Sequence, residues 1–330
     1  MNSCARMIVF QLPLLFLVFL TSCATLPQHY KENNQLAYIV DYDNSIARQH
    51  LPVFIIANPN EKHNLVGTPS SKATGDTKEE IYVNPEIPTI YAETRKFTTQ
   101  KESYTNLIYR IHFEKVPFSI FPFFLGWGKN VGVIVVVTLN KDGMPILYTT
   151  VQTCGCYLVF IPTSYTPRDA FPDGWNIERQ TAYGENLPGL LDFKDVPLDQ
   201  AITLIFIKND SHRVEEIAVS SASVLMNYKT EKAHIQPLDS LQRLSLEGMG
   251  STSFYENSGY RKGYVKGSSK PWERLLMSWW TLNWTVGQDK KLGRDKEDNP
   301  IFHTSLKPWA RDESDLRDFP TFLKYWGWKL

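Results

Sequence analysis

An uninterrupted apolar segment followed by a turn is the feature that most constrains the fold. Residues 131–139 read VGVIVVVTL and are rich in β-branched side chains, which favour strands. A turn sequence follows from Asn140 to Gly143, and a second apolar segment runs from Met144 to Thr153. This pattern predicts a β-hairpin. Because the first strand is apolar on both sides, other parts of the chain must cover both faces of its sheet.

Other segments predict further extended structure. Short apolar runs over residues 157–161, 201–207 and 217–226 predict additional strands. Residues 81–98 contain two prolines, which favours extended edge segments over helix. Residues 58–80 are rich in Gly, Pro, Ser and Thr and predict a long surface loop.

Helical patterns are concentrated in the C-terminal quarter. Residues 271–284 carry apolar side chains at helical spacing, and Pro271 suits the first turn of a helix. Residues 312–325 predict a second helix, broken or restarted at Pro320. We therefore predict an α+β fold: a mainly antiparallel sheet with helices from the C-terminal quarter packed on it.

One internal segment is long enough to be tested as a membrane span. Residues 116–139 number 24 and contain one charge, Lys129, whereas a spanning helix needs about 20 apolar residues. Two prolines interrupt the first half, and the β-branched density after Val131 favours a strand. The segment therefore predicts a buried strand.

The first 23 residues have the features of a secretory signal. Arg6 is the only charge among the first 22 residues, and an apolar core runs from Met7 to Leu20. The core is followed by Leu20-Thr21-Ser22-Cys23, with small residues ahead of the cysteine. This pattern resembles the lipobox of bacterial lipoproteins, in which the cysteine is acylated and becomes the new N-terminus. The resemblance implies that residues 1–22 are a signal peptide and that Cys23 carries lipid.

The same resemblance implies a location. Ala24 stands where an aspartate would retain such a lipoprotein at the inner membrane. We therefore expect the protein to be anchored by lipid in the outer membrane of the cell envelope, facing the periplasm. Membrane affinity would come from the acyl chains, at about 0.8 kcal/mol per buried methylene. Residues 23–36 are then the lipidated cysteine and a polar tether, and residues 37–330 form a single globular domain with a Trp-rich helical part over 271–330.

The charge balance excludes one class of partner. Acidic and basic residues number 35 each, and removal of Arg6 leaves the remaining chain slightly acidic. Without a basic excess we expect no nucleic-acid partner. The chain also lacks the G-x-S-x-G, H-E-x-x-H and P-loop motifs. We expect no cofactor.

The cysteines leave one open question. Of the four, Cys4 leaves with the signal peptide and Cys23 carries the lipid. If Cys154 and Cys156 lie on a strand, their thiols project from the same face. Together with His112 on a preceding segment they could form a metal site, or by themselves a redox pair or a disulfide. The alternative is two small buried residues without a catalytic role.

Tryptophan is concentrated near the C-terminus, where seven of the nine follow residue 270. Tryptophan favours membrane interfaces and also stacks on sugars. One helical stripe contains Trp272, Leu275, Leu276 and Trp279, and we predict that it packs on the sheet. Trp280 and Trp284 lie toward the edge of this stripe and are better candidates for contact with lipid or ligand.

The segment 248–267 combines five glycines with aromatic and basic residues. It predicts a mobile surface loop, with sugar or anionic-polymer binding as the alternative. Two functions follow from these patterns. The first is a membrane-anchored envelope lipoprotein with a binding or structural role toward an envelope protein or glycan. The second is a periplasmic enzyme or metal/redox protein that uses Cys154 and Cys156.

Overall fold

The computed structural model describes residues 34–41, 45–74, 79–194, 196–246, 250–294 and 300–330. The signal peptide, Cys23 and most of the predicted tether lie outside the described residues. The described residues all belong to one compact unit, which extends from Glu32 to Leu330.

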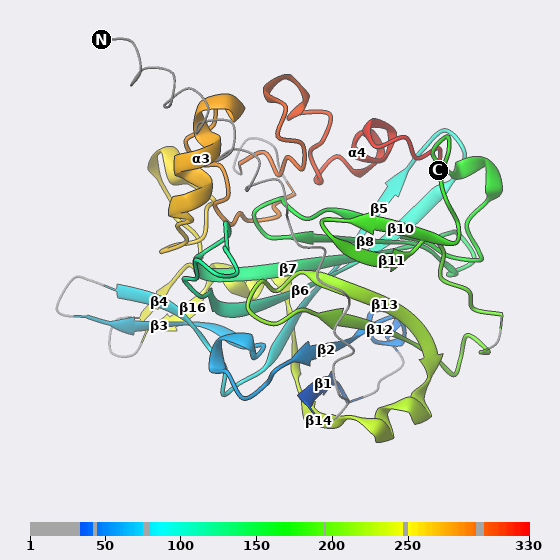
Figure 1. The fold of residues 1–330 in the computed structure, drawn as a ribbon, viewed down its shortest axis with the longest axis horizontal. Coiled ribbons are helices and arrows are strands. Elements are labelled where there is room, and N and C mark those ends of the chain that lie inside the picture. The colour runs from blue at the N-terminus through cyan, green and yellow to red at the C-terminus, as the bar shows by residue number, and fades with distance from the viewer. Residues whose placement is uncertain (1–33, 42–44, 75–78, 195, 247–249, 295–299) are drawn as a thin grey trace, which may run out of the picture. The chain divides into compact units, whose positions relative to one another are not determined.

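The predicted hairpin is at the centre of the larger sheet (Figure 1). Its strands are β7 (Gly128–Leu139) and β8 (Pro145–Gln152), paired antiparallel so that Val135 faces Thr150. The sheet order is β15-β5-β6-β7-β8-β9. The added strands are β5 (Thr89–Thr98), β6 (Ser103–Val116), β9 (Val159–Pro162) and β15 (His234–Pro237). Every residue of β8, and every residue of β7 except Lys129, is buried, as both-face coverage requires.

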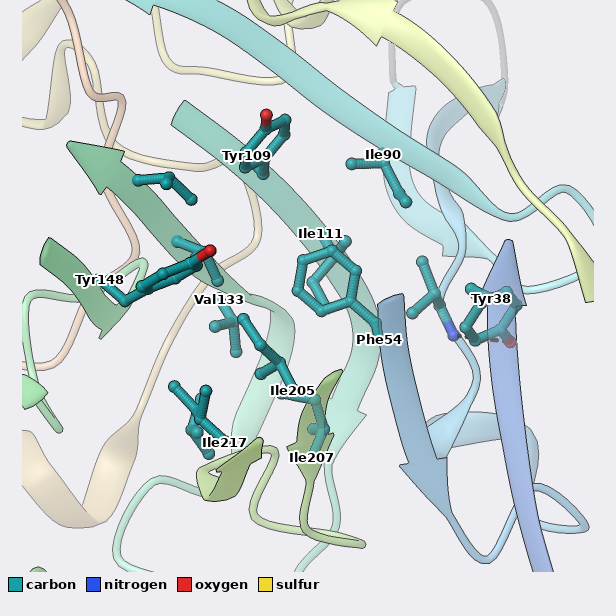
Figure 2. Close-up of a cluster of buried hydrophobic side chains, with 14 of the residues drawn as sticks. Tyr38, Phe54, Ile90, Tyr109, Ile111, Val133, Tyr148, Ile205, Ile207 and Ile217 are labelled. Carbon is teal, nitrogen blue, oxygen red and sulfur yellow. Dashed lines mark hydrogen bonds between the residues drawn. The ribbon is translucent and has the colours of Figure 1, made fainter. Parts of the chain in front are cut away.

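A second, mixed sheet packs on one face of this one. Its order is β13-β12-β2-β1-β14, from β1 (Gln35–Ile39), β2 (Val53–Ala57), β12 (Ala201–Ile207), β13 (Val214–Ser221) and β14 (Lys229–Lys232). Between the sheets is a continuous apolar cluster. Figure 2 shows Phe54 and Ile205 from the second sheet pointing toward Ile111 and Val133 of the first.

C-terminal segments cover the opposite face of the central sheet. Ile134 and Val136 of β7 share a second apolar cluster with Phe254, Phe302 and Phe322. Helix α4 (Phe319–Tyr325) packs here, with the ring of Phe319 5.2 Å from that of Phe97 on β5. The α+β prediction, with helices near the C-terminus and a sheet covered on both faces, is confirmed.

Shorter elements complete the fold. Three small hairpins pair β3 (Thr68–Ala73) with β4 (Glu79–Asn84), β10 (Arg179–Ala182) with β11 (Glu185–Pro188), and β16 (Leu244–Leu246) with β17 (Gly250–Thr252). The short helical turns are α2 (Ile46–Gln49), η2 (Lys62–Asn64), η3 (Arg168–Ala170), η4 (Ala222–Asn227), η5 (Leu238–Gln242), η6 (Gly259–Arg261) and η7 (Pro308–Ala310). The longer helix α3 (Pro271–Thr281) starts at Pro271, as predicted.

Several sequence expectations need correction. The segment 58–80, predicted as a loop, contains η2, β3 and the start of β4, and its Val66 is fully buried. Strand β5 lies between β15 and β6 and is not an edge. The strand predicted over 217–226 ends at Ser221 and continues as η4. In the first two cases strand pairing overrides the local preference for a loop or an edge.

Two further expectations concern the C-terminal half. In the segment 248–267, whose residues 248 and 249 lie outside the described residues, Phe254, Tyr255 and Tyr264 are buried rather than displayed on a loop. The second C-terminal helix begins only at Phe319, with Pro320 in its first turn, where proline is tolerated.

The internal segment tested as a membrane span is not helical. Residues 116–139 end β6, pass through an irregular segment and form β7. Within the described part of the chain, no helix is long and apolar enough to cross a membrane.

Candidate functional site

Cys154, Gly155 and Cys156 lie in a tight turn after β8, not on a strand as the sequence suggested. The Gly155 amide donates a hydrogen bond to Gln152 O (2.8 Å), and the Gln152 amide donates to Cys156 O (2.9 Å). Gly155 has φ +94°, and a Cβ there would collide with the carbonyl oxygen of His303. The turn, rather than the alternation of a strand, brings the two cysteines together.

Cys154 and Cys156 are free cysteines, and the sulfur of Cys154 contacts groups of the same turn. The backbone amide of Cys156 donates to Cys154 Sγ (3.4 Å), and Cys154 Sγ lies 3.9 Å from Gln152 Oε1. Gln152 is in turn held by Ser211, because its Nε2 donates to Ser211 O (2.8 Å). Cys154 is only 3% exposed, whereas Cys156 is half-buried. The sulfur of the less accessible cysteine therefore accepts one hydrogen bond, from the Cys156 amide, and in its protonated form donates one, to Gln152 Oε1.

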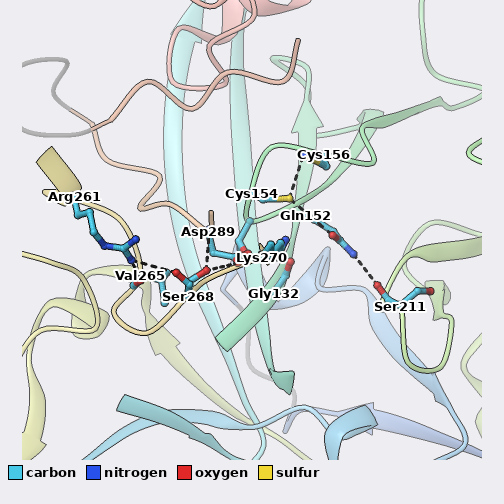
Figure 3. A network of polar contacts seen from close by, with 11 residues as sticks. Gly132, Gln152, Cys154, Cys156, Ser211, Arg261, Val265, Ser268, Lys270 and Asp289 are labelled. Carbon is cyan, nitrogen blue, oxygen red and sulfur yellow. Dashed lines mark hydrogen bonds and ion pairs between the residues drawn. The ribbon is translucent and has the colours of Figure 1, made fainter. Parts of the chain in front are cut away.

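Four charged side chains are buried around this turn, each no more than 2% exposed: Lys270, Glu273, Asp289 and Lys290. Lys270 precedes α3 and Glu273 lies in its first turn, while Asp289 and Lys290 lie on the segment after α3. The Lys290 amide donates to Thr153 O (2.9 Å), which attaches that segment to the cysteine turn. Figure 3 shows Lys270 and Asp289 gathered beside Cys154.

Asp289 organises the polar contacts of this cluster. Its carboxylate accepts hydrogen bonds from Ser268 Oγ (2.8 Å) and Thr153 Oγ1, and lies 3.7 Å from Lys270 Nζ. Lys270 Nζ makes no hydrogen bond to any described residue, and the same holds for Glu273 Oε2. An ammonium and a carboxyl oxygen buried without hydrogen bonds cost stability, and such groups are uncommon unless a site uses them.

The electrostatics of the cluster separate the two thiols. Burial opposes ionisation of Cys154, but the hydrogen bond from the Cys156 thiol and the charge of Lys270 outweigh it and lower the pKa of Cys154 to about 6. Hydrogen bonding to Cys154, followed by burial, raises the pKa of Cys156 well above its usual value. The two thiols are therefore inequivalent: the cluster favours ionisation at Cys154 and disfavours it at Cys156.

The surrounding charges are also perturbed. Burial raises the pKa of Glu273 to about 8, so this carboxyl group is largely protonated at neutral pH. Burial lowers the pKa of Lys290 to about 8. Burial opposes the charge of Lys270 as well, but Asp289 and Cys154 hold its pKa well above the usual value. Lys270 therefore stays positively charged over a wider pH range than Lys290 does.

His112 occupies a different environment from the cysteines. It lies on β6 with its ring edge-on to Phe254 (4.8 Å), and Arg110 Nε donates to its Nε2 (2.9 Å). Burial and the neighbouring guanidinium of Arg110 hold the pKa of His112 well below its usual range. Among the described residues no three His, Cys, Asp or Glu side chains are grouped closely enough to hold a metal ion. The structure therefore does not join His112 with Cys154 and Cys156 as metal ligands.

Helix α3 covers this cluster in an unexpected orientation. Its buried residues are the polar ones, Glu273, Ser278 and Thr281. The stripe predicted to pack on the sheet instead faces outward: Trp279 is 72% exposed, and Leu275 and Leu276 are exposed too. The prediction was wrong because spacing identifies a stripe but not the direction in which it points. Trp280 and Trp284 are exposed, as the edge position suggested.

A second segment extends the exposed apolar surface. Phe118 and Phe123, from the irregular segment between β6 and β7, stack around Trp272 of α3 at 6.5 and 5.9 Å. Phe121, between them, is 94% exposed. We call the combined surface the apolar face; it comprises Phe118, Ile120, Phe121, Phe123, Leu275, Leu276, Trp279, Trp280, Leu282 and Trp284.

Sequence reasoning identified Cys154 and Cys156 but missed Lys270, Glu273, Asp289 and Lys290. In a chain with 70 charged residues, nothing local separates these four from solvated ones. The one available signal was the helical pattern around Pro271, which places Glu273 on the flank of the apolar stripe.

Comparisons with known proteins add no assignment. No family model matches the chain, and no curated protein or solved structure is significantly similar to it.

Proposed function

We propose that this protein is a lipid-anchored envelope protein whose body binds a lipid bilayer surface through the apolar face. The observation that carries the proposal is the orientation of α3, whose polar side is buried and whose Trp and Leu side chains point to solvent. The anchor is acylated Cys23, which resembles a lipobox cysteine and lies outside the described residues. The location is the outer membrane, on its periplasmic side.

The composition of the face suits a bilayer interface. Trp279, Trp280 and Trp284 combine a large apolar ring with an N–H group, and such side chains collect where one edge is wet and the other apolar. Phe121 is almost fully exposed and lies at the tip of the adjoining segment. Contiguous exposed apolar surface on a soluble body marks an interaction site. Burial of one large apolar side chain contributes about 1.5–3 kcal/mol, so a few suffice for reversible binding.

The lipid anchor and the apolar face have different roles in membrane binding. Acyl chains hold a protein at a membrane without orienting it. An apolar face formed by two segments that pack around Trp272 fixes which side of the body meets the lipid. The body then needs no spanning segment.

The first experiment tests the anchor. In the full-length protein, Cys23→Ala is expected to remove acylation, seen by mass spectrometry, and to release most of the protein from isolated membranes. Unchanged retention of an unacylated protein would count against the lipid as the main anchor.

The second experiment tests the face. In the Cys23→Ala background, sedimentation with phosphatidylcholine vesicles is expected to show weak binding, which Phe121→Ser with Trp279→Ser reduces at least fivefold, about 1 kcal/mol. Met226→Ser is the control, because Met226 is 85% exposed but lies on η4 beyond the second sheet. Equal sedimentation of all three proteins would contradict the proposal.

Other occupants of the face predict other results. If a second copy of the chain covers the apolar face, the Cys23→Ala protein forms a dimer in sedimentation velocity and does not bind vesicles. The Phe121→Ser/Trp279→Ser variant is then a monomer. If the face binds a glycan, soluble peptidoglycan fragments quench the fluorescence of the exposed tryptophans and vesicles do not. Either result would replace the membrane proposal.

A further inference from the structure

We propose that Cys154 and Cys156 form a redox site that reduces a small hydroperoxide, a function separate from membrane binding. The geometry consists of two thiols in one turn, a buried ammonium without a hydrogen-bond partner among the described residues, and a second cysteine, Cys156, that is half-buried rather than buried.

The cluster has features that packing alone does not require. Lys270, Glu273, Asp289 and Lys290 are all removed from water, although burial of charges is costly unless they are paired and hydrogen-bonded. Lys270 Nζ reaches Asp289 only at 3.7 Å. A thiolate at Cys154 would add a second negative charge near this ammonium, beside that of Asp289.

Accessibility determines the class of substrate. Cys154, the nucleophilic sulfur, is 3% exposed, so a disulfide on another protein cannot reach it. Cys156 is more accessible, but its sulfur is protonated and is a poor nucleophile for disulfide exchange. Hydrogen peroxide is two oxygen atoms in size and needs only a small opening. The arrangement therefore favours a small hydroperoxide over a disulfide.

In the first step the hydroperoxide oxidises Cys154 to a sulfenic acid. The Cys154 thiolate attacks the outer oxygen of the hydroperoxide, an S–O bond forms and the O–O bond breaks. Sulfur loses two electrons and becomes a sulfenic acid, while the leaving oxygen takes up a proton and departs as water or an alcohol. The neutral carboxyl group of Glu273 is one proton source available in this buried cluster.

The second step uses the neighbouring thiol. Cys156 attacks the Cys154 sulfur, the S–O bond breaks, and water leaves as the Cys154–Cys156 disulfide forms. A small external dithiol restores the site in two exchanges. Its first thiolate attacks the more accessible Cys156 sulfur and Cys154 departs as a stabilised thiolate; its second thiolate then attacks its own sulfur in the mixed disulfide and releases Cys156. The net reaction converts one hydroperoxide and one dithiol into an external disulfide, one water from the second step, and a water or alcohol from the first.

The electrostatic groups that influence the Cys154 sulfur come from several segments. They are Cys156 on its own turn, Lys270 and Glu273 at the start of α3, Asp289 and Lys290 after α3, and Tyr157 and Tyr183 beside the turn. Lys270 is the cation that directly favours the thiolate. We class Lys270 as a positioning residue, because it acts through Cys154.

The test uses the reduced, full-length protein and hydrogen peroxide. After trypsin digestion, the peptide of residues 142–168 contains both thiols. Peroxide is expected to remove two hydrogens from this peptide, and Cys156→Ser is expected to stop at a Cys154 sulfenic acid that dimedone labels. Cys154→Ser should show neither product. If peroxide leaves wild-type Cys154 unmodified, or if oxidised glutathione reacts faster than peroxide, the proposal is wrong.

A pH profile separates the electrostatic role of Lys270 from a structural one. Lys270→Met is expected to slow peroxide oxidation about tenfold at pH 7 and to approach the wild-type rate above pH 9, where the Cys154 thiol is ionised in both proteins. Lys129→Met, at an exposed position, is the matched control and should leave the profile unchanged. Should Lys270→Met fail to fold, the wild-type profile decides: a rate midpoint near pH 8.5 rather than 6 contradicts the proposal.

Discussion

Apolar residues are buried in the hairpin of β7 and β8 but exposed on helix α3. In the hairpin, apolar side chains are buried on both faces of the sheet. In α3, Glu273, Ser278 and Thr281 are buried while Leu275 and Trp279 are exposed. Both elements have clear periodic patterns, but only the hairpin follows the rule that apolar residues face inward.

The difference comes from what lies beneath each element. The hairpin is packed between two apolar clusters, one on each face of the sheet. An apolar side chain on either face is therefore removed from water, which stabilises the fold. The region under α3 contains Lys270, Asp289 and Lys290, which favour polar neighbours. A helix covering a charged cluster stabilises the protein with its polar side and leaves its apolar side for another surface.

The largest expected effect on stability comes from the apolar cluster between the two sheets. Phe54→Ala removes a fully buried ring between the two sheets and is expected to reduce the free energy of unfolding by about 3–5 kcal/mol. Urea denaturation measures this change. Met226→Ala, at an exposed position, should remain within about 0.5 kcal/mol of wild type. A loss below about 1 kcal/mol for Phe54→Ala would mean that the sheets do not pack as described.

The second effect tests the charged cluster through pH. The pKa of Glu273 is raised from 4.5 to about 8, so its proton stabilises the fold fully below pH 4.5, and this contribution is lost as the pH rises to 8. Glu273→Gln remains neutral and avoids the loss. We expect its stability relative to wild type to increase by about 2–4 kcal/mol between pH 5 and pH 8. A stability difference that does not change with pH would place Glu273 in contact with water.

The third effect probes the orientation of α3 directly. Ser278→Leu places a large apolar side chain on the buried side and is expected to cost about 1–3 kcal/mol. Arg274→Leu introduces the same residue at an exposed position of the same helix and should change stability little. If Ser278→Leu instead stabilises the protein, then the helix has an apolar surface beneath it.

The smallest effect is expected on the apolar face. Leu275→Ser and Trp284→Ser alter exposed side chains and should each stay within about 0.5 kcal/mol of wild type in thermal unfolding without lipid. A loss of more than about 2 kcal/mol would show that the residue packs inside the body, which the sequence pattern predicted for Leu275 but not for Trp284.

The predictable part of the fold was the part in which local pattern and environment agree. The strand over 201–207 and the hairpin around Asn140 appear with nearly the predicted bounds, because apolar residues in them are also buried. Strand β3 and the start of β4 were not predicted, since the polar sequence over 58–80 forms a strand only by pairing with the extended segment that begins at Ile81. Cys154 and Cys156 were expected together, but on a strand rather than in a turn.

The sequence by itself determined a sheet with both faces covered, because a continuous β-branched run cannot remain in contact with water. It also determined the lipobox resemblance of Cys23 and an amphipathic helix starting at Pro271. Only the tertiary structure decided that this helix turns its apolar stripe outward and that four distant charges surround Cys154. Periodicity along a chain records which residues share a side, whereas the direction of that side depends on the free energy of the surface it meets.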